Sequence, residues 1–174
     1  MVDSGILTED DPVELLEGWL VTKMPKNPQH TLANQLTSAA LMRVVPAGWF
    51  VNVQEPITTA DSEPEPDVAV VRGDRRDYKE RHPAPGDVAL VVEISDATLQ
   101  RDRTIKLRLY AGAGIPVYWI LNLPDQLLHV HTDPEGSGER AIYRQQTTYD
   151  LADEVSVIID GQTIAQLPVQ GLFS

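Results

Sequence analysis

The chain has 174 residues, of which 42% are hydrophobic, and this is enough to bury the core of one domain. Its net charge of -12 argues against broad, nonspecific binding of nucleic acid, which relies on lysine and arginine neutralising phosphates. No apolar run approaches the roughly 20 residues of a membrane-spanning helix, and the lack of cysteine excludes disulfides and thiolate metal sites. We therefore expect one domain over residues 1–174, in the cytoplasm and away from the membrane.

The first elements predicted along the chain are a hairpin and a helix. Two short apolar runs flank Glu17-Gly18, a pair typical of a tight hairpin turn. Asn27 and Pro28 are typical of the cap and the first turn of a helix. Apolar residues at helical spacing predict that this helix runs over residues 30–45, where Pro46 ends it.

The middle of the chain alternates predicted strands with a second helix. Apolar, β-branched runs predict strands over residues 49–58, 67–72 and 88–94. A helix is predicted over residues 99–113, and another buried strand over residues 117–121. The last strand, helix and strand of this series have the order of a βαβ unit with a right-handed crossover.

The C-terminal third predicts a hairpin of residues 127–131 and 141–149, followed by a strand over residues 155–159. The order of all these elements implies a mixed sheet with helices packed against it. The predicted fold class is therefore mixed α/β (α+β), with an N-terminal hairpin and additional C-terminal strands.

Two acids lie inside the predicted buried strands. Asp67 follows Pro66 at the start of one strand, and Glu93 lies near the carboxyl end of another. A carboxylate in a buried strand is costly unless it is paired, hydrogen-bonded or bound to a metal. Because side chains alternate between the two faces of a strand, both acids can point into one pocket if their strands are neighbours.

A lysine on the second predicted helix completes this group. Asp102, Lys106 and Tyr110 are four residues apart and form one stripe, which can face the strand end where open α/β sheets place their sites. Mg²⁺ prefers oxygen ligands, commonly one or two carboxylates with water and substrate phosphate. A lysine beside the activated water can offset the developing negative charge. Two acids and one lysine are thus enough for metal-dependent hydrolysis of a phosphodiester.

An ordinary structural interpretation of the same residues stays open at this point. Asp67 could be a strand-entry residue that is hydrogen-bonded to loop amides. Glu93 and Lys106 could form an ion pair with no role in chemistry.

The order of several sequence motifs resembles the Uma-two family, which belongs to the PD-(D/E)xK, restriction-endonuclease-like superfamily. The resemblance spans about residues 9 to 170. The matching motifs in chain order are Val13–Gly18, His30, Glu65–Val68, Val91–Ser95, Asp102 with Lys106 and Tyr110-Ala111, and Gly114–Ile120.

The resemblance implies a restriction-endonuclease-like mixed sheet flanked by helices. It also implies that Asp67 and Glu93 hold Mg²⁺ or Mn²⁺, and that the substrate is nucleic acid, DNA rather than RNA. The superfamily's usual lysine position, two residues after the second acid, is occupied here by Ser95. The superfamily tolerates migration of this lysine to the following helix, so the resemblance gives Lys106 the catalytic role and leaves Ser95 as a helix-entry cap. A homodimer is a further expectation from the resemblance.

Two other functions are compatible with the sequence. One is a noncatalytic module that keeps the nuclease-like fold and serves as a binding or regulatory partner, which the acidic net charge favours. The other is a hydrolase that acts on a small phosphorylated substrate, for which a negative surface is less of an obstacle.

Several further residues have more than one interpretation. Glu14 is expected to be an exposed hairpin charge, with a metal ligand as the alternative. His30 is expected to start a helix or to pack, although it could reach a substrate phosphate. Tyr110 is expected in the core, where it could also line the pocket. His129 and His131 are predicted to form a solvent-facing pair, because no third metal ligand is evident near them.

Overall fold

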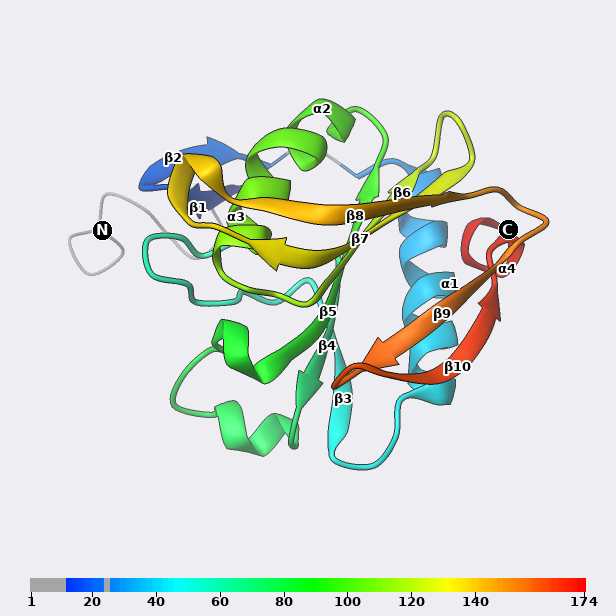
Figure 1. The fold of residues 1–174 in the computed structure, drawn as a ribbon, viewed down its shortest axis with the longest axis horizontal. Coiled ribbons are helices and arrows are strands. Elements are labelled where there is room, and N and C mark those ends of the chain that lie inside the picture. Colours follow the sequence, from blue (N-terminus) through cyan, green and yellow to red (C-terminus); the bar gives the residue numbers. More distant parts are fainter. Residues whose placement is uncertain (1–11, 24–25) are drawn as a thin grey trace.

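A six-stranded mixed sheet lies at the centre of the computed structural model, which describes residues 12–23 and 26–174 (Figure 1). The order of its strands is β3-β4-β5-β6-β7-β8. β5 and β6 run parallel, and the other neighbouring pairs run antiparallel. The bounds are β3 (Trp49–Val53), β4 (Val68–Arg72), β5 (Val88–Ser95), β6 (Val117–Asn122), β7 (Leu127–Glu135) and β8 (Ile142–Tyr149).

The two parallel strands, β5 and β6, are buried at every residue. Their nearly continuous apolar sequences suit strands that are covered on both faces. The chain crosses from one to the other through α2 (Leu99–Arg101), a π-helical turn (Asp102–Lys106) and α3 (Leu107–Gly112). The βαβ unit predicted from the sequence is therefore present.

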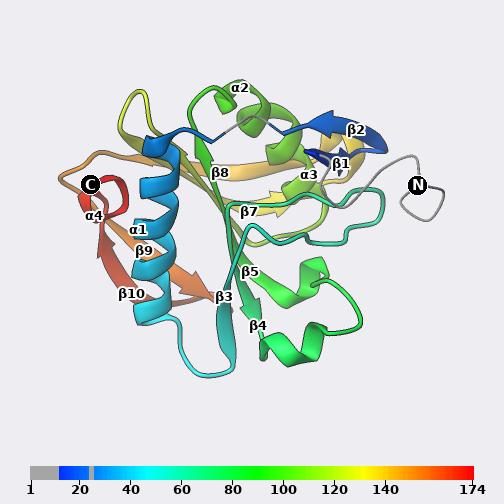
Figure 2. The same cartoon turned by 180° about the vertical axis from the view of Figure 1, so that it is seen from behind.

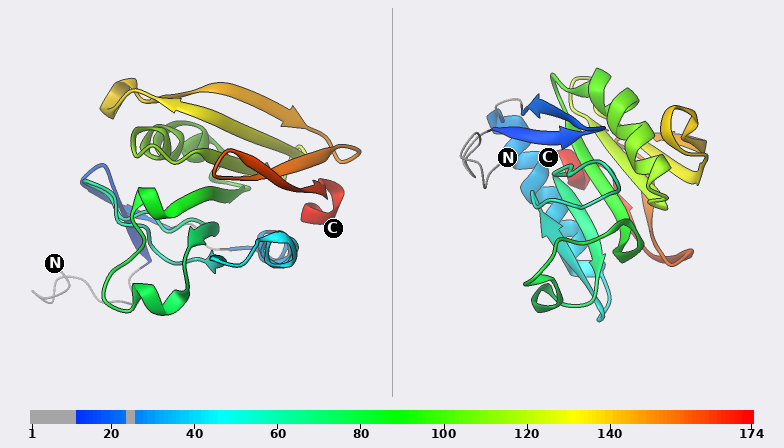
Figure 3. Two further views of the ribbon diagram at one scale, coloured as in Figure 1. Left: turned by 60° about the horizontal axis from the view of Figure 1, so that its bottom comes forward. Right: turned by 90° about the vertical axis from the view of Figure 1, so that its left-hand side faces the viewer.

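The core has one layer on each side of the sheet. On one side, α1 (Pro28–Val44) packs on the sheet together with a C-terminal hairpin, through residues such as Leu41, Val92 and Val157. On the other side, α3 packs against the sheet through residues such as Tyr110 and Tyr118. Figures 2 and 3 show α1 and the α2–α3 crossover on different sides of the sheet.

The start of α1 follows the predicted capping chemistry. The side chain of Asn27 accepts a hydrogen bond from the backbone N–H of His30 at 2.9 Å, and Pro28 occupies the first turn. The cap satisfies a donor that the helix itself leaves free. It also fixes the position of His30 in the first turn of α1, from which its side chain projects.

Two hairpins lie outside the central sheet. β1 (Val13–Leu16) pairs with β2 (Trp19–Thr22), and the turn residues Glu17 and Gly18 have φ angles of 49° and 79°. Positive φ at both turn residues is what a tight two-residue hairpin requires. β9 (Glu154–Ile159) pairs with β10 (Gln162–Pro168), which leads into α4 (Gln170–Phe173).

The mixed α/β fold class, with its N-terminal hairpin and C-terminal strands, is confirmed, but some predicted bounds are wrong. The strand predicted over residues 49–58 ends at Val53 because Gln54 has a φ of 56° and Pro56 follows. β10 and α4 were not predicted, since residues 162–166 contain only two apolar side chains, Ile164 and Ala165, and are largely exposed. Among the described residues, no helix is both long and apolar enough to cross a membrane.

Candidate active site

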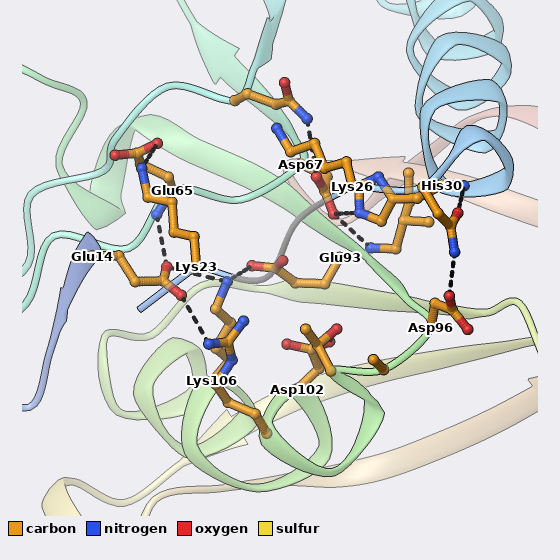
Figure 4. A pocket seen from close by; sticks show the side chains of 16 residues that line it. Glu14, Lys23, Lys26, His30, Glu65, Asp67, Glu93, Asp96, Asp102 and Lys106 are labelled. Carbon is orange, nitrogen blue, oxygen red and sulfur yellow. Dashed lines mark hydrogen bonds and ion pairs between the residues drawn. The ribbon is translucent and has the colours of Figure 1, made fainter. Parts of the chain in front are cut away.

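A small pocket opens at the carboxyl end of β5, where the β1–β2 hairpin, the start of α1 and the crossover helix meet (Figure 4). Its volume is about 90 Å³. Charged side chains dominate its lining. The acidic ones are Glu14, Glu65, Asp67, Glu93, Asp96 and Asp102, and the basic ones are Lys23, Lys26, Arg101 and Lys106.

Asp67 immediately precedes β4, and its side chain is held by three donors. One carboxylate oxygen accepts the backbone N–H of Ile94 at 2.9 Å and lies 3.1 Å from His30 Nε2. The other accepts from Gln54 Nε2 at 3.2 Å. Burial works to raise the pKa of Asp67, but the contacts with His30 and Ile94 and the charge of Lys106 outweigh it, so the pKa lies below its usual value. Asp67 is therefore ionised at neutral pH.

Glu93 lies on β5, next to β4, the strand that Asp67 precedes, and only 4% of its surface is exposed. Its Oε1 accepts hydrogen bonds from Lys106 Nζ at 2.9 Å and from the Tyr110 hydroxyl at 2.7 Å. Burial raises the pKa of Glu93 to about 8, although the nearby Lys106 charge works against the shift. Burial thus disfavours the ionised form of Glu93, and Lys106 offsets this only in part.

Lys106 comes from the π-helical turn and lies between two carboxylates. Its Nζ is 2.9 Å from Glu93 Oε1 and 3.3 Å from Glu14 Oε2. Burial lowers the pKa of Lys106, but the acidic groups of Glu93, Glu14 and Asp102 outweigh it and raise the pKa above its usual value. The side chain is therefore an ammonium group. π-helical turns are rare and frequently occur at functional sites.

Asp102 is hydrogen-bonded both to the end of β5 and to Thr98, the residue at the N-cap of α2. Its Oδ2 accepts hydrogen bonds from Ser95 Oγ at 2.7 Å and from Thr98 Oγ1 at 2.6 Å, while its buried Oδ1 has no partner in the described part of the chain. Burial raises the pKa of Asp102. The prediction that Ser95 caps the helix is wrong, because Ser95 is the last residue of β5 and its hydroxyl binds this carboxylate.

The structure brings Asp67, Glu93 and Lys106 together in one pocket and adds two residues to them. Glu14 was expected to be an exposed charge, and this is wrong: it is 4% exposed because the hairpin folds over the pocket and places it beside Lys106. His30 contacts Asp67, a role that the sequence left undecided. A helix cap at Asn27 was the available signal for the position of His30, but no sequence pattern indicated where the hairpin would dock.

The prediction of a solvent-facing pair at His129 and His131 is also wrong. Both lie on β7 and are 5% and 4% exposed. His129 lies 2.6 Å from Arg103 Nη2 and 3.0 Å from Thr148 Oγ1, while His131 stacks on Tyr118. They are buried because the crossover helix covers this face of the sheet.

Acidic side chains outnumber basic ones among the buried residues that line the pocket. Among residues 12–23 and 26–174, no group of three or more histidine, aspartate or glutamate side chains is arranged so that it could hold a metal ion. Four buried acidic side chains nevertheless line the pocket, and Lys106 is the one buried basic side chain among the lining residues that the structure describes. Burial is the main cause of the raised pKa values of Glu93 and Asp102, and the neighbouring acids Asp102, Asp67 and Glu14 add to the shift of Glu93. In proteins Mg²⁺ is commonly held by one or two carboxylates and by water.

The sheet, its crossover helix and the two flanking hairpins define a restriction-endonuclease-like fold. A crystal structure described as "a putative nuclease belonging to DUF820", from Anabaena variabilis ATCC 29413, has this fold with a TM-score of 0.71. The two chains are 16% identical, and the match covers 96% of this chain and 93% of that one. The sequence model of the family Uma2, described as "Putative restriction endonuclease", matches residues 5–168. The chain therefore belongs to the Uma2 family, which confirms the resemblance. No curated protein shows significant similarity to it.

Proposed function

We propose that this protein is an endonuclease that hydrolyses phosphodiester bonds with the help of Mg²⁺ or Mn²⁺. The observation that carries the proposal is the meeting of Asp67, Glu93 and Lys106 in one small, largely buried pocket. Membership of a family described as restriction endonucleases supports it.

Asp67 and Glu93 would hold the divalent cation. When bound, the cation supplies an activated water and offsets the negative charge that develops on the phosphate. Asp67 is suited to this role because His30, Gln54 and the Ile94 amide orient its ionised carboxylate. The ionised form of Glu93 would be stabilised by the cation, because burial raises the pKa of this residue in the absence of a further positive charge.

Lys106 acts through its positive charge in this proposal. A general base must lose its proton near the working pH, whereas the pKa of Lys106 is raised above its usual value. Its ammonium group would instead orient the attacking water and stabilise charge on the phosphate. Tyr110 supports the same carboxylate, since it donates a hydrogen bond to Glu93.

The substrate in this proposal is nucleic acid, and DNA rather than RNA follows from the family resemblance. Lys23 and Lys26 line the pocket and offer positive charge to a phosphate backbone, although Lys23 is also paired with Glu65 at 2.6 Å. The net charge of -12 limits further contacts with phosphates, so we expect binding to depend weakly on salt.

We further propose that the protein is a homodimer and that it is located in the cytoplasm. Light scattering of the purified protein would test the homodimer.

Cleavage assays on single- and double-stranded DNA and RNA test the proposal directly. Wild type is expected to cleave at least one of them with Mg²⁺ or Mn²⁺, and Asp67→Asn is expected to lose activity by about 100-fold or more. Asp133→Asn is the matched control, because Asp133 is exposed and lies outside the pocket. Equal activity of wild type and Asp67→Asn would remove the site assignment.

A noncatalytic binding or regulatory module is the second candidate. It is favoured by the pairing of Glu93 with Lys106, which satisfies both groups without any cation, and by the acidic net charge. A hydrolase of a small phosphorylated substrate is a third, compatible with the small volume of the pocket. Metal binding that depends on Asp67 distinguishes a nuclease from the noncatalytic module. The kind of substrate that is cleaved distinguishes a nuclease from the hydrolase of a small phosphorylated substrate.

A further inference from the structure

Glu14 is a buried acid that the proposed reaction does not yet use. It lies on β1, outside the central sheet, and its carboxylate faces three donors from three different segments. Oε2 lies 3.3 Å from Lys106 Nζ and 3.4 Å from the backbone nitrogen of Glu65. Oε1 lies 3.8 Å from Arg101 Nη1. Figure 4 shows Glu14 and Glu93 approaching Lys106 from different directions.

A lysine ammonium group has three donors at the end of a flexible stem of four carbons. The Glu93 carboxylate accepts a hydrogen bond from one of these donors. Two carboxylates, Glu93 at 2.9 Å and Glu14 at 3.3 Å, fix Nζ between them. A third donor then remains for a group inside the pocket.

Glu14 also gives Lys106 a negative partner when the proposed cation takes up the charge of Glu93. A divalent cation on Glu93 would repel the Lys106 ammonium, since both positive groups share one carboxylate. Glu14 belongs to a different strand and gives Lys106 a second acidic partner. With this partner, Lys106 does not have to leave the pocket when Glu93 is shared.

We propose that Glu14 is a positioning residue, which holds the Lys106 ammonium beside Glu93 and so links the β1–β2 hairpin to the active site. Its effect on catalysis rests on the proposed function. Its effect on the position of Lys106 does not, and the two are measured separately.

The hairpin offers a matched control at Glu17. This residue docks the same hairpin on α3 through two contacts with Arg108, at 2.8 and 2.5 Å, outside the pocket. Glu17→Gln therefore weakens the docking without touching Lys106. Glu14→Gln preserves the shape of the side chain, but all three partners of Glu14 are donors. Either orientation of the amide then turns its own N–H groups toward another donor.

The first measurement is an NMR spectrum of the Lys106 ammonium group, without metal or substrate. A buried, hydrogen-bonded ammonium group exchanges slowly with water and gives a separate signal, which its absence in Lys106→Met assigns. Glu14→Gln is expected to shift or broaden this signal, and Glu17→Gln to leave it unchanged. Glu14→Asp, which retracts the carboxylate by one methylene, is expected to give a smaller change and serves if Glu14→Gln does not fold. An unchanged signal in the Glu14 variants, an equal change in Glu17→Gln, or no such signal in wild type would overturn the proposal.

The second measurement uses cleavage kinetics. Glu14→Gln is expected to lower kcat roughly tenfold with little change in KM, because the substrate still binds while the ammonium is displaced. Glu17→Gln is expected to match wild type. A kcat of Glu14→Gln equal to that of wild type would contradict the proposed role in catalysis. If wild type cleaves no substrate, the proposed function fails, and the NMR comparison still decides whether Glu14 positions Lys106.

Discussion

At the scale of single residues, the pocket depends on charges that are buried together. Lys106 is 3% exposed and Glu93 4% exposed, so neither charge is stabilised by bulk water. A buried pair adds little to stability by itself, because desolvation offsets the attraction. Removing one partner, however, leaves an uncompensated group in the interior. The pair is therefore expected to behave as a unit.

Lys106→Met is expected to lower the free energy of unfolding by about 3 kcal/mol, because it leaves Glu93 without its nearest positive charge. Urea denaturation at pH 8 measures this loss. Adding Glu93→Gln to Lys106→Met is expected to recover part of the stability, since Glu93, the nearer of the two acids that lose Lys106, is then replaced by a neutral side chain. A double variant that is as unstable as the sum of the two single variants would show that the residues do not act as a pair.

At this scale, the sequence predicted which side chains meet in the pocket where a residue conflicted with its surroundings. Asp67 and Glu93 were identifiable because acids in apolar strands need a partner, and Lys106 because it lies four residues from Asp102. Glu14 was missed because an acid in a short hairpin strand is normally exposed. Its burial depends on what the hairpin packs against, which local sequence does not specify.

At the scale of secondary-structure elements, the caps and turns set where the site residues lie. Asn27 caps α1 by accepting the His30 N–H, and its Nδ2 donates to Asp96 after β5. One side chain therefore joins the helix start to the strand end that carries the pocket. The cap could be predicted from the dipeptide Asn27-Pro28. The π-helical turn at Asp102–Lys106 could not, because no residue preference distinguishes it from an α-helix.

Asn27→Ala is expected to lower the free energy of unfolding by about 1 kcal/mol, the usual cost of losing a helix cap. Thermal or urea denaturation measures the change. Gln29→Ala is the control, since Gln29 is an exposed residue in the same helical turn. If both variants were equally stable, the cap would contribute nothing to this helix.

At the scale of the whole molecule, covering both faces of the sheet buries groups that titrate. His131 on β7 is enclosed between Tyr118 and Tyr143, and burial lowers its pKa to about 4. The arrangement of helices was predictable from the order of elements, but the burial of β7 was not. The alternation of His129 and His131 with apolar residues is equally typical of a half-exposed strand.

This shift predicts a stability that depends on pH. Because the pKa of His131 is lower in the folded chain than the usual 6.5, the unfolded chain takes up the proton first as pH falls. The contribution of His131 is complete above pH 6.5 and is lost toward pH 4. Between pH 7 and pH 5 it amounts to about 2 kcal/mol.

The measurement is the difference in urea stability between wild type and His131→Phe at these two pH values. The comparison is needed because Glu93, whose pKa is raised to about 8, changes stability in the opposite direction over the same interval. Wild type is expected to lose about 2 kcal/mol relative to His131→Phe on going from pH 7 to pH 5. His82→Phe, at an exposed histidine, is expected to show no such difference. Parallel pH profiles for wild type and His131→Phe would contradict the assignment.

A crystal structure of the protein soaked in Mn²⁺, with the anomalous signal of the metal, tests the central claim most directly. We expect one strong peak within coordinating distance of both Asp67 and Glu93, and no peak at this position in Asp67→Asn. A pocket without manganese in wild type, or a peak away from these two carboxylates, would contradict it.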